Sequence, residues 1–121
     1  GIYHSTVKRQ YHPYIRPQET GNKTDVRWLT LTNLNGIGIR IEGLQPLSIS
    51  ALNYRPEDFD PGLTKKFQGV NNLYPRKEVT LSVDLFQRGL GGNDSWGAQP
   101  LDDYRFYGKN YNYGYIIFPK K

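Results

Sequence analysis

The sequence predicts an all-β fold, specifically an antiparallel β-sandwich that carries one short helical turn. Its 121 residues include 10 tyrosines, 13 glycines and 8 prolines but no methionine, a composition typical of aromatic strands joined by tight turns. Apolar and polar residues alternate along several short segments, as expected for strands with one buried face. A chain of this length is expected to form a single domain, residues 1–121, with a modest core.

The first half of the chain predicts a meander of three strands. Apolar residues in the segment 26–32 lie on parts of both faces, so something is expected to cover each side of this strand. The Asn35-Gly36 pair predicts a tight hairpin into a one-sided strand over residues 37–41. A turn at Gln45-Pro46 is then expected to lead into a third strand over residues 47–51.

The second half predicts one helical turn followed by further strands. A proline and two acidic residues within 55–62 suit the first turn of a short helix, and a Pro-Gly pair ends it. Residues 63–75 show no clear period and are expected to form a loop. The alternation over 79–85 predicts the most regular strand of the chain. A short strand over 104–107 and a last strand over 111–118 complete the fold.

The aromatic residues favour structural positions. Trp28 lies inside a predicted strand and is expected in the core, with its indole N–H satisfied nearby. Tyr111, Tyr113 and Tyr115 alternate along one strand face, which favours a core position or a cross-strand aromatic ladder. A platform on which nucleic-acid bases stack is the less favoured interpretation of these tyrosines.

Charge and composition exclude several classes of partner. The net charge is +5, but the basic residues form scattered pairs and no long run, so we expect no nucleic-acid partner. No cysteine is present, which excludes disulfides and thiolate chemistry. No apolar stretch approaches the roughly 18 residues that a membrane span requires, so we expect no membrane partner.

The acidic and histidine residues predict no catalytic or metal site. A glycosidase needs two carboxyl groups at a defined separation across the scissile bond. The acidic residues within 57–60 suit the helix dipole, and Asp102 and Asp103 point to opposite faces if they are extended. His4 and His12 have no partner at metal-ligand or triad spacing. We therefore predict that no residue of this chain is catalytic and that none binds a metal.

The glycine-rich loop over residues 89–97 is the candidate functional feature. Gly91 and Gly92 permit left-handed backbone, and Asn93 and Asp94 favour turns, so the loop is predicted to double back and hold Trp96 at its apex. An exposed indole suits the apolar face of a sugar, whose hydroxyls would reach Asn93 or Asp94. Tryptophan is highly buried on average, so spacing alone favours a core position for Trp96 over sugar contact.

Three blocks of the sequence carry a resemblance. Residues 11–33 (YHPYIRPQETGNKTDVRWLTLTN), residues 48–60 (SISALNYRPEDFD) and residues 78–98 (EVTLSVDLFQRGLGGNDSWGA) resemble, in this order, the C-terminal domain of family 2 glycoside hydrolases of the β-galactosidase type. The blocks cover most of the chain. In that family the tryptophan at the position of Trp96 reaches into the sugar pocket of a separate catalytic barrel, so the resemblance reverses the preference and favours sugar contact.

The resemblance implies a non-catalytic role within a larger enzyme. It identifies the chain as the last part of a C-terminal (fifth), small-chain-type domain, within the supersandwich of these enzymes. The barrel of the parent chain would hydrolyse terminal β-D-galactosides with retention, and magnesium and sodium ions would bind there, with no cofactor in this segment. By itself the chain is expected to be inactive and to associate with itself through the exposed apolar residues Leu29, Leu31, Ile116 and Phe118.

Two alternatives remain at this point. The first is an autonomous carbohydrate-binding module, in which Trp96 and surface tyrosines bind glycan without an enzyme. The second, less favoured, is a basic nucleic-acid-binding module. The sequence next to this chain in its gene distinguishes the enzyme from the module, because only the enzyme adjoins a barrel.

Overall fold

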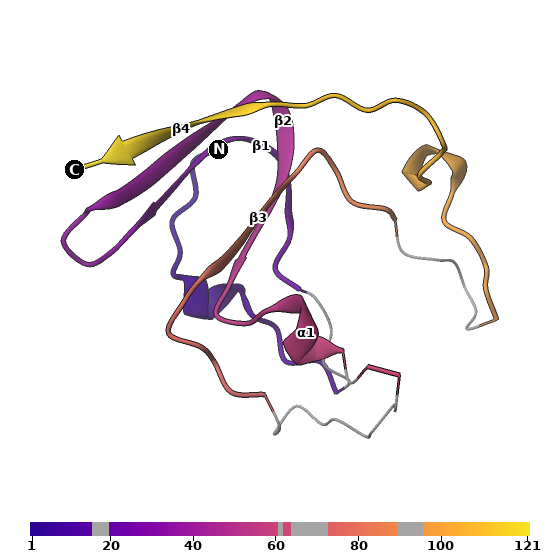
Figure 1. Cartoon of the computed structure of the whole chain (residues 1–121), viewed down its shortest axis with the longest axis horizontal. Coiled ribbons are helices and arrows are strands. Elements are labelled where there is room, and N and C mark those ends of the chain that lie inside the picture. Colours follow the sequence, from indigo (N-terminus) through magenta and orange to yellow (C-terminus); the bar gives the residue numbers. More distant parts are fainter. Residues whose placement is uncertain (16–19, 61, 64–72, 90–95) are drawn as a thin grey trace. The chain divides into compact units, whose positions relative to one another are not determined.

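The structure is a computed structural model that describes residues 1–15, 20–60, 62–63, 73–89 and 96–121 (Figure 1). Its described elements are the 3₁₀ turn η1 (Val7–Gln10), the strands β1 (Lys23–Thr32) and β2 (Gly38–Leu52), the helical turn α1 (Pro56–Phe59), the strand β3 (Thr80–Asp84), the 3₁₀ turn η3 (Asp102–Tyr104) and the strand β4 (Tyr115–Lys120). Strands dominate this set. The predicted all-β fold and its short helical turn are therefore confirmed.

The four strands form one sheet in which β2 is hydrogen-bonded to each of the others. β4 runs antiparallel to the first part of β2, with Gly38 opposite Lys120 and Gly43 opposite Tyr115. The chain divides into two compact units, residues 1–23 with 49–83 (the first unit) and residues 24–48 with 84–121 (the second unit). β2 contributes to both units. The single domain expected from the sequence stays a prediction.

The hairpin between β1 and β2 forms where the Asn35-Gly36 pair predicts it. The side-chain oxygen of Asn33 accepts hydrogen bonds from the backbone N–H of Asn35 at 2.9 Å and of Ile37 at 3.1 Å. Gly36 has a φ of +80°, a left-handed conformation that side chains disfavour. Together the Asn33 side chain and the glycine close the turn and set the pairing of the two strands.

The predicted turn at Gln45-Pro46 is wrong, because β2 runs without interruption from Gly38 to Leu52. The side-chain amide of Gln45 donates to the Gly114 carbonyl at 3.2 Å and accepts from the Gly114 N–H at 3.1 Å. The Leu44 N–H donates to the same carbonyl at 3.0 Å. Pro46 has no backbone N–H to donate. The side-chain amide of Gln45 supplies a donor and an acceptor next to it, and the extended backbone continues.

The strand predicted over residues 104–107 is also wrong. Residues 102–104 form η3, and the Arg105 side chain donates to the Pro100 carbonyl at 2.7 Å and pairs with Asp102 at 2.9 Å. These local contacts compete with strand pairing. The last strand begins at Tyr115 and not at residue 111.

The tyrosine ladder predicted along the last strand is reduced to one pair. The rings of Tyr113 and Tyr115 lie 6.3 Å apart, whereas Tyr111 packs against Phe86 at 5.5 Å and Phe106 at 6.3 Å. Phe86 and Phe106 lie 4.8 Å apart. Tyr111 therefore belongs to an aromatic cluster with residues outside the strand, in the second unit.

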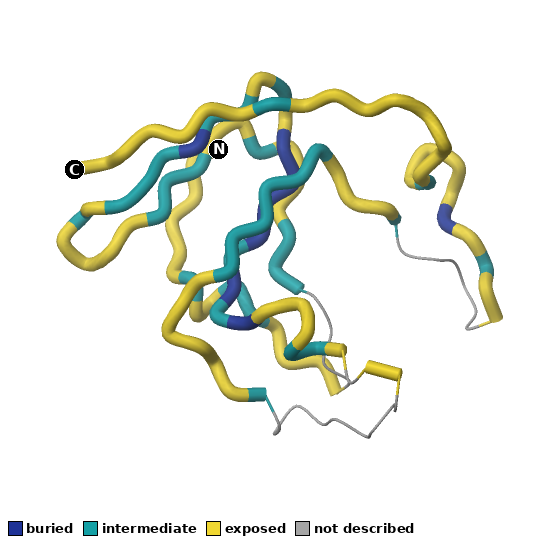
Figure 2. Tube along the Cα trace, viewed as in Figure 1, coloured by how far each residue is buried: buried dark blue, intermediate teal, exposed yellow. Residues whose placement is uncertain are grey.

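Most of the buried residues lie on β2 (Figure 2). Ile41, Leu47, Ile49 and Leu52 are the buried aliphatic residues, and Ser48, Ser50 and Tyr54 are buried with them. Trp28 was expected in the core but is 39% exposed, so this prediction is wrong. The Arg40 guanidinium lies 4.2 Å from the Trp28 ring centroid, and this cation–π contact covers an indole that stays at the surface.

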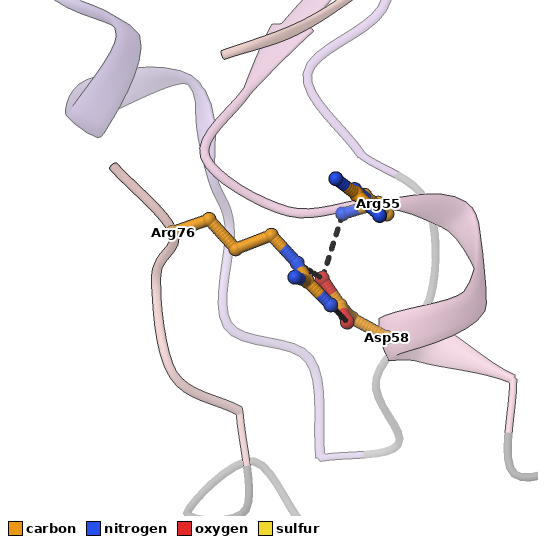
Figure 3. A network of polar contacts seen from close by, with 3 residues as sticks. All are labelled: Arg55, Asp58 and Arg76. Atoms are coloured by element: carbon orange, nitrogen blue, oxygen red, sulfur yellow. Dashed lines mark hydrogen bonds and ion pairs between the residues drawn. The ribbon is translucent and has the colours of Figure 1, made fainter. Parts of the chain in front are cut away.

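The helical turn α1 is held by a polar network (Figure 3). The Asp58 carboxylate accepts from the Arg55 backbone N–H at 2.7 Å, and the Asp58 N–H donates to the Arg55 carbonyl at 3.0 Å. Arg76 adds a bidentate contact, with Nε–Oδ2 at 2.8 Å and Nη2–Oδ1 at 2.6 Å. The hydrogen bond from Arg76 is the main reason that the pKa of Asp58 falls from 3.8 to about 2.

Replacing Arg76 by methionine is expected to return the pKa of Asp58 toward 3.8, because the bidentate donor is lost while the apolar stem is kept. Since the folded pKa is the lower one, ionised Asp58 stabilises the unaltered chain above pH 3.8, and this stabilisation disappears as the pH falls through about 2. Carboxyl-carbon NMR titration measures the change. Arg55→Met is the control, because its backbone N–H still reaches Asp58. Equal pKa shifts in both variants would contradict the role of Arg76.

Strand β4 presents apolar side chains at the surface. Tyr115, Ile116, Ile117 and Phe118 are each between 40% and 55% exposed. β4 pairs with β2 and with no other strand of the described sheet, so its outer backbone groups have no strand partner there. Leu29 and Leu31 on β1 are half-buried. An apolar strand with an unpaired edge is a surface that other chains readily join.

The chain by itself is therefore expected to associate, and the double substitution Ile116→Lys/Phe118→Lys is expected to shift it toward the monomer. Two lysines remove the apolar contact and repel a second copy. Sedimentation equilibrium over a range of concentrations measures the effect. Ile2→Lys, a substitution at an exposed residue outside the sheet, is the control. A strictly monomeric unaltered chain at high concentration would refute the expectation.

Candidate functional site

Trp96 is the most exposed tryptophan of the chain, with 94% of its surface accessible. The core position that spacing alone favoured for Trp96 is therefore not what the described residues show. A large rigid ring held at the surface offers a flat apolar face of the kind that sugars contact. The other residues of the predicted sugar site, Asn93 and Asp94, and the loop-shaping Gly91 and Gly92 lie outside the described residues.

The segments on either side of Trp96 are joined by side-chain and backbone hydrogen bonds. The Arg88 Nη2 donates to the Gln99 Oε1 at 2.6 Å, a contact between residues eleven positions apart in the sequence. The same Gln99 amide donates through Nε2 to the Gly97 carbonyl at 3.4 Å. We call the segment 88–99 the Trp96 loop, and the Arg88–Gln99 contact closes it at its base.

A second contact fixes the start of the Trp96 loop. The Gly89 N–H donates to the Tyr104 carbonyl at 2.8 Å. A Cβ atom at Gly89 would lie 2.5 Å from the Cβ of Tyr104 and 3.3 Å from the Cβ of Pro100, which is buried. Only glycine permits this close approach of the two backbones. The Pro100 carbonyl is held in turn by the Arg105 side chain, so both ends of the loop lie on an ordered support.

No local pattern in the sequence predicts this support of the Trp96 loop. Arg88, Gln99 and Tyr104 are ordinary surface residue types. The Arg88–Gln99 pair is separated by eleven positions and the Gly89–Tyr104 pair by fifteen, and neither separation follows a regular period. Gly89 begins the glycine-rich loop predicted over residues 89–97, and no pattern there predicts a close contact for it. Its close approach to Tyr104 becomes visible only when η3 is placed against the base of the loop.

Three acidic residues of the described chain are engaged in ion pairs. Asp102 pairs with Arg105 at 2.9 Å, Asp58 with Arg76 at 2.6 Å and Glu42 with Arg40 at 2.6 Å. With a pKa of about 2, Asp58 is ionised at neutral pH and cannot serve as a general acid there. Within the described ranges, no three His, Asp or Glu side chains come together in a group that could hold a metal ion.

One hollow of about 100 Å³ lies within the second unit. It is lined by Thr24, Asp25, Pro46, Leu47, Ser48, Leu85 and Phe86. Ligand pockets ordinarily enclose about 300–1,000 Å³, so this hollow is small for a sugar ring. The exposed face of Trp96 therefore remains the candidate site among the described residues. No helix among them is long and apolar enough to cross a membrane.

The amino-acid sequence of the chain is similar to those of known beta-galactosidases. Residues 1–117 match the family described as beta galactosidase small chain. The chain is 41% identical over 106 residues to a beta-galactosidase of Priestia megaterium, covering 88% of this chain and 10% of that protein. It is 37% identical over 100 residues to a beta-galactosidase of Lactobacillus delbrueckii subsp. bulgaricus, covering 82% and 9%. It is 32% identical over 108 residues to the beta-galactosidase BgaC of Bifidobacterium adolescentis, covering 87% and 10%. The chain thus spans about a tenth of the length of these relatives.

Substituting Gly89 by alanine is expected to lower the free energy of unfolding by about 1–3 kcal/mol, because the added Cβ collides with Tyr104 and forces the backbones apart. Chemical denaturation measures the difference. Gly108→Ala is the matched control, since a Cβ there meets nothing within 4 Å, and its effect is expected to stay within about 0.5 kcal/mol. Equal stabilities of the two variants would show that the base of the loop is not closely packed.

Proposed function

Because the chain belongs to the beta-galactosidase small-chain family, we propose that it is the C-terminal β-sandwich segment of a retaining family 2 glycoside hydrolase that acts on terminal β-D-galactosides. The proposal assigns the chemistry to a catalytic barrel elsewhere in the parent polypeptide. This division agrees with the length of the relatives, of which the chain matches about a tenth. A barrel of this type alone needs about 250 residues.

In this proposal the chain supplies Trp96 to the sugar pocket of the barrel. The observation that carries the assignment is the indole itself, which is 94% exposed on a loop whose base is tied by hydrogen bonds. The C–H groups on one face of a pyranose pack on such a ring and are removed from water with it. Asn93 and Asp94 are proposed to orient the sugar hydroxyls.

The ionisable residues fit a supporting role. Asp58, Asp102 and Glu42 each stabilise local structure by pairing with an arginine. Retention requires two carboxyl groups about 5–5.5 Å apart, and in this proposal the barrel contributes both. Magnesium and sodium are proposed to bind the barrel as well, as the resemblance to family 2 glycoside hydrolases implies.

The exposed indole also supports a second candidate, an autonomous carbohydrate-binding module. In that case the chain alone would bind galactosides through Trp96 without a barrel. Isothermal calorimetry of the chain with galactose and lactose separates the two candidates. Binding that disappears in Trp96→Ala favours the module, whereas sugar contact only in the assembled enzyme favours the segment.

The test of the main proposal uses a chimera in which this chain replaces the matching segment of the Priestia megaterium beta-galactosidase. Trp96→Ala is expected to weaken galactoside binding by about 1–3 kcal/mol, roughly 5- to 150-fold in KM, because the packed aromatic contact is lost. Its melting temperature should hardly change, since the ring is exposed. Trp96→Phe should recover part of the affinity through its smaller ring.

Trp28→Ala is the matched control in the same chimera. This indole packs against Arg40 on the sheet, so its loss should lower the melting temperature and leave the KM unchanged. The opposite outcome at position 96, a destabilised enzyme with normal sugar affinity, would end the proposed role of Trp96. Inactivity of the chimera with the unaltered chain would count against the family 2 assignment.

A further inference from the structure

The Arg88–Gln99 contact joins the two ends of the segment that carries Trp96. Arg88 lies before the glycine-rich stretch and Gln99 lies three residues after the tryptophan. Their side chains meet at 2.6 Å, a short distance for a hydrogen bond from a charged donor. Gln99 also donates through Nε2 to the carbonyl of Gly97, the residue that follows Trp96. The Gln99 amide thus links Arg88, before the glycine-rich stretch, to the backbone of Gly97 beside the indole.

We propose that Arg88 and Gln99 are positioning residues that pre-organise Trp96 for sugar contact, a role that rests on the function proposed above for Trp96. Their contact, which we call the brace, holds the two described flanks of the Trp96 loop, residues 88–89 and 96–99, at a fixed separation. The indole is then already restricted before a sugar arrives, and less conformational freedom is lost on binding. Neither Arg88 nor Gln99 needs to touch the sugar for this effect.

The surroundings of the brace support a local role. Arg88 is followed directly by Gly89, whose N–H is bound to Tyr104, so the backbone that carries the arginine is itself fixed. Gln99 is followed directly by Pro100, which is buried and whose carbonyl accepts from Arg105. The brace therefore joins two anchored points, and its Gln99 end lies three residues from Trp96.

The energetics separate positioning from general stabilisation. Both side chains are exposed, and a solvent-exposed polar contact adds little to the free energy of unfolding. Loss of the brace should therefore leave the melting temperature nearly unchanged while it loosens the tryptophan. A purely structural residue would show the opposite pattern.

The first experiment measures the motion of Trp96 in the chain itself. The heteronuclear ¹⁵N NOE of the Trp96 indole N–H is expected to fall in Arg88→Ala and in Gln99→Ala, and the double variant should add little to either. The Trp28 indole N–H in the same spectra is the internal reference and should not change. Arg27→Ala, which removes an exposed arginine from β1, is the matched control. An unchanged NOE of Trp96 in both single variants overturns the proposal.

The second experiment measures sugar binding in the chimera with the Priestia megaterium beta-galactosidase. Arg88→Ala and Gln99→Ala should each raise the KM by about two- to tenfold, the range that corresponds to ordering a side chain, with little change in kcat. Gln99→Glu keeps an acceptor for Arg88 but loses the donor to the Gly97 carbonyl, so its KM is expected to lie between that of the unaltered chain and that of Gln99→Ala. A raised KM in Arg88→Ala alone would make Arg88 a direct sugar ligand and overturn the brace.

The two experiments distinguish failure of the brace from failure of the proposed function. If the brace variants loosen Trp96 but leave the KM unchanged, and Trp96→Ala also leaves it unchanged, the brace is supported and the sugar contact of Trp96 is refuted. If Trp96→Ala raises the KM while the brace variants change neither the NOE nor the KM, the sugar contact is supported and the brace is refuted.

Discussion

The rest of the structure depends on the long central strand β2, Gly38–Leu52. Among the described strands it alone is hydrogen-bonded to all the others, and every buried aliphatic residue of the described chain lies on it. Pairing satisfies its backbone groups, and burial of its side chains supplies the apolar contacts that hold the sheet together. β2 continues through Gln45-Pro46, although this dipeptide is typical of a turn, because the Gln45 side chain is hydrogen-bonded to Gly114.

At several points in the described chain, polar side chains form hydrogen bonds with backbone groups that have no backbone partner there. Asn33 caps the hairpin, Gln45 continues the pairing past a proline, and Asp58 closes the helical turn. Each such hydrogen bond contributes only about 1 kcal/mol. They matter because the buried set is small and the elements are short, so local geometry is set by these contacts as well as by the core.

The two tryptophans show how the same side chain serves different ends. The sheet tryptophan Trp28 is covered by the guanidinium of Arg40, which lowers the area of indole left in water. Trp96 is held at 94% exposure by a loop with a tied base. Exposing an indole forgoes the favourable free energy of burying it, and this arrangement is understandable where another surface or a sugar completes the contact.

The sequence by itself determined the strand-rich fold, the Asn35-Gly36 hairpin and the helical turn after Arg55, because these features rest on local alternation and on residues with special backbone preferences. It also singled out Trp96. Tertiary structure alone decided the continuity of β2, the exposure of Trp28 and the absence of a strand at residues 104–107, since each depends on a partner distant in the chain or on competing side-chain contacts. The support of the Trp96 loop belongs to the same group. Gly89 contacts Tyr104 across fifteen positions of the sequence, and Arg88 contacts Gln99 across eleven, and no periodicity predicts such contacts.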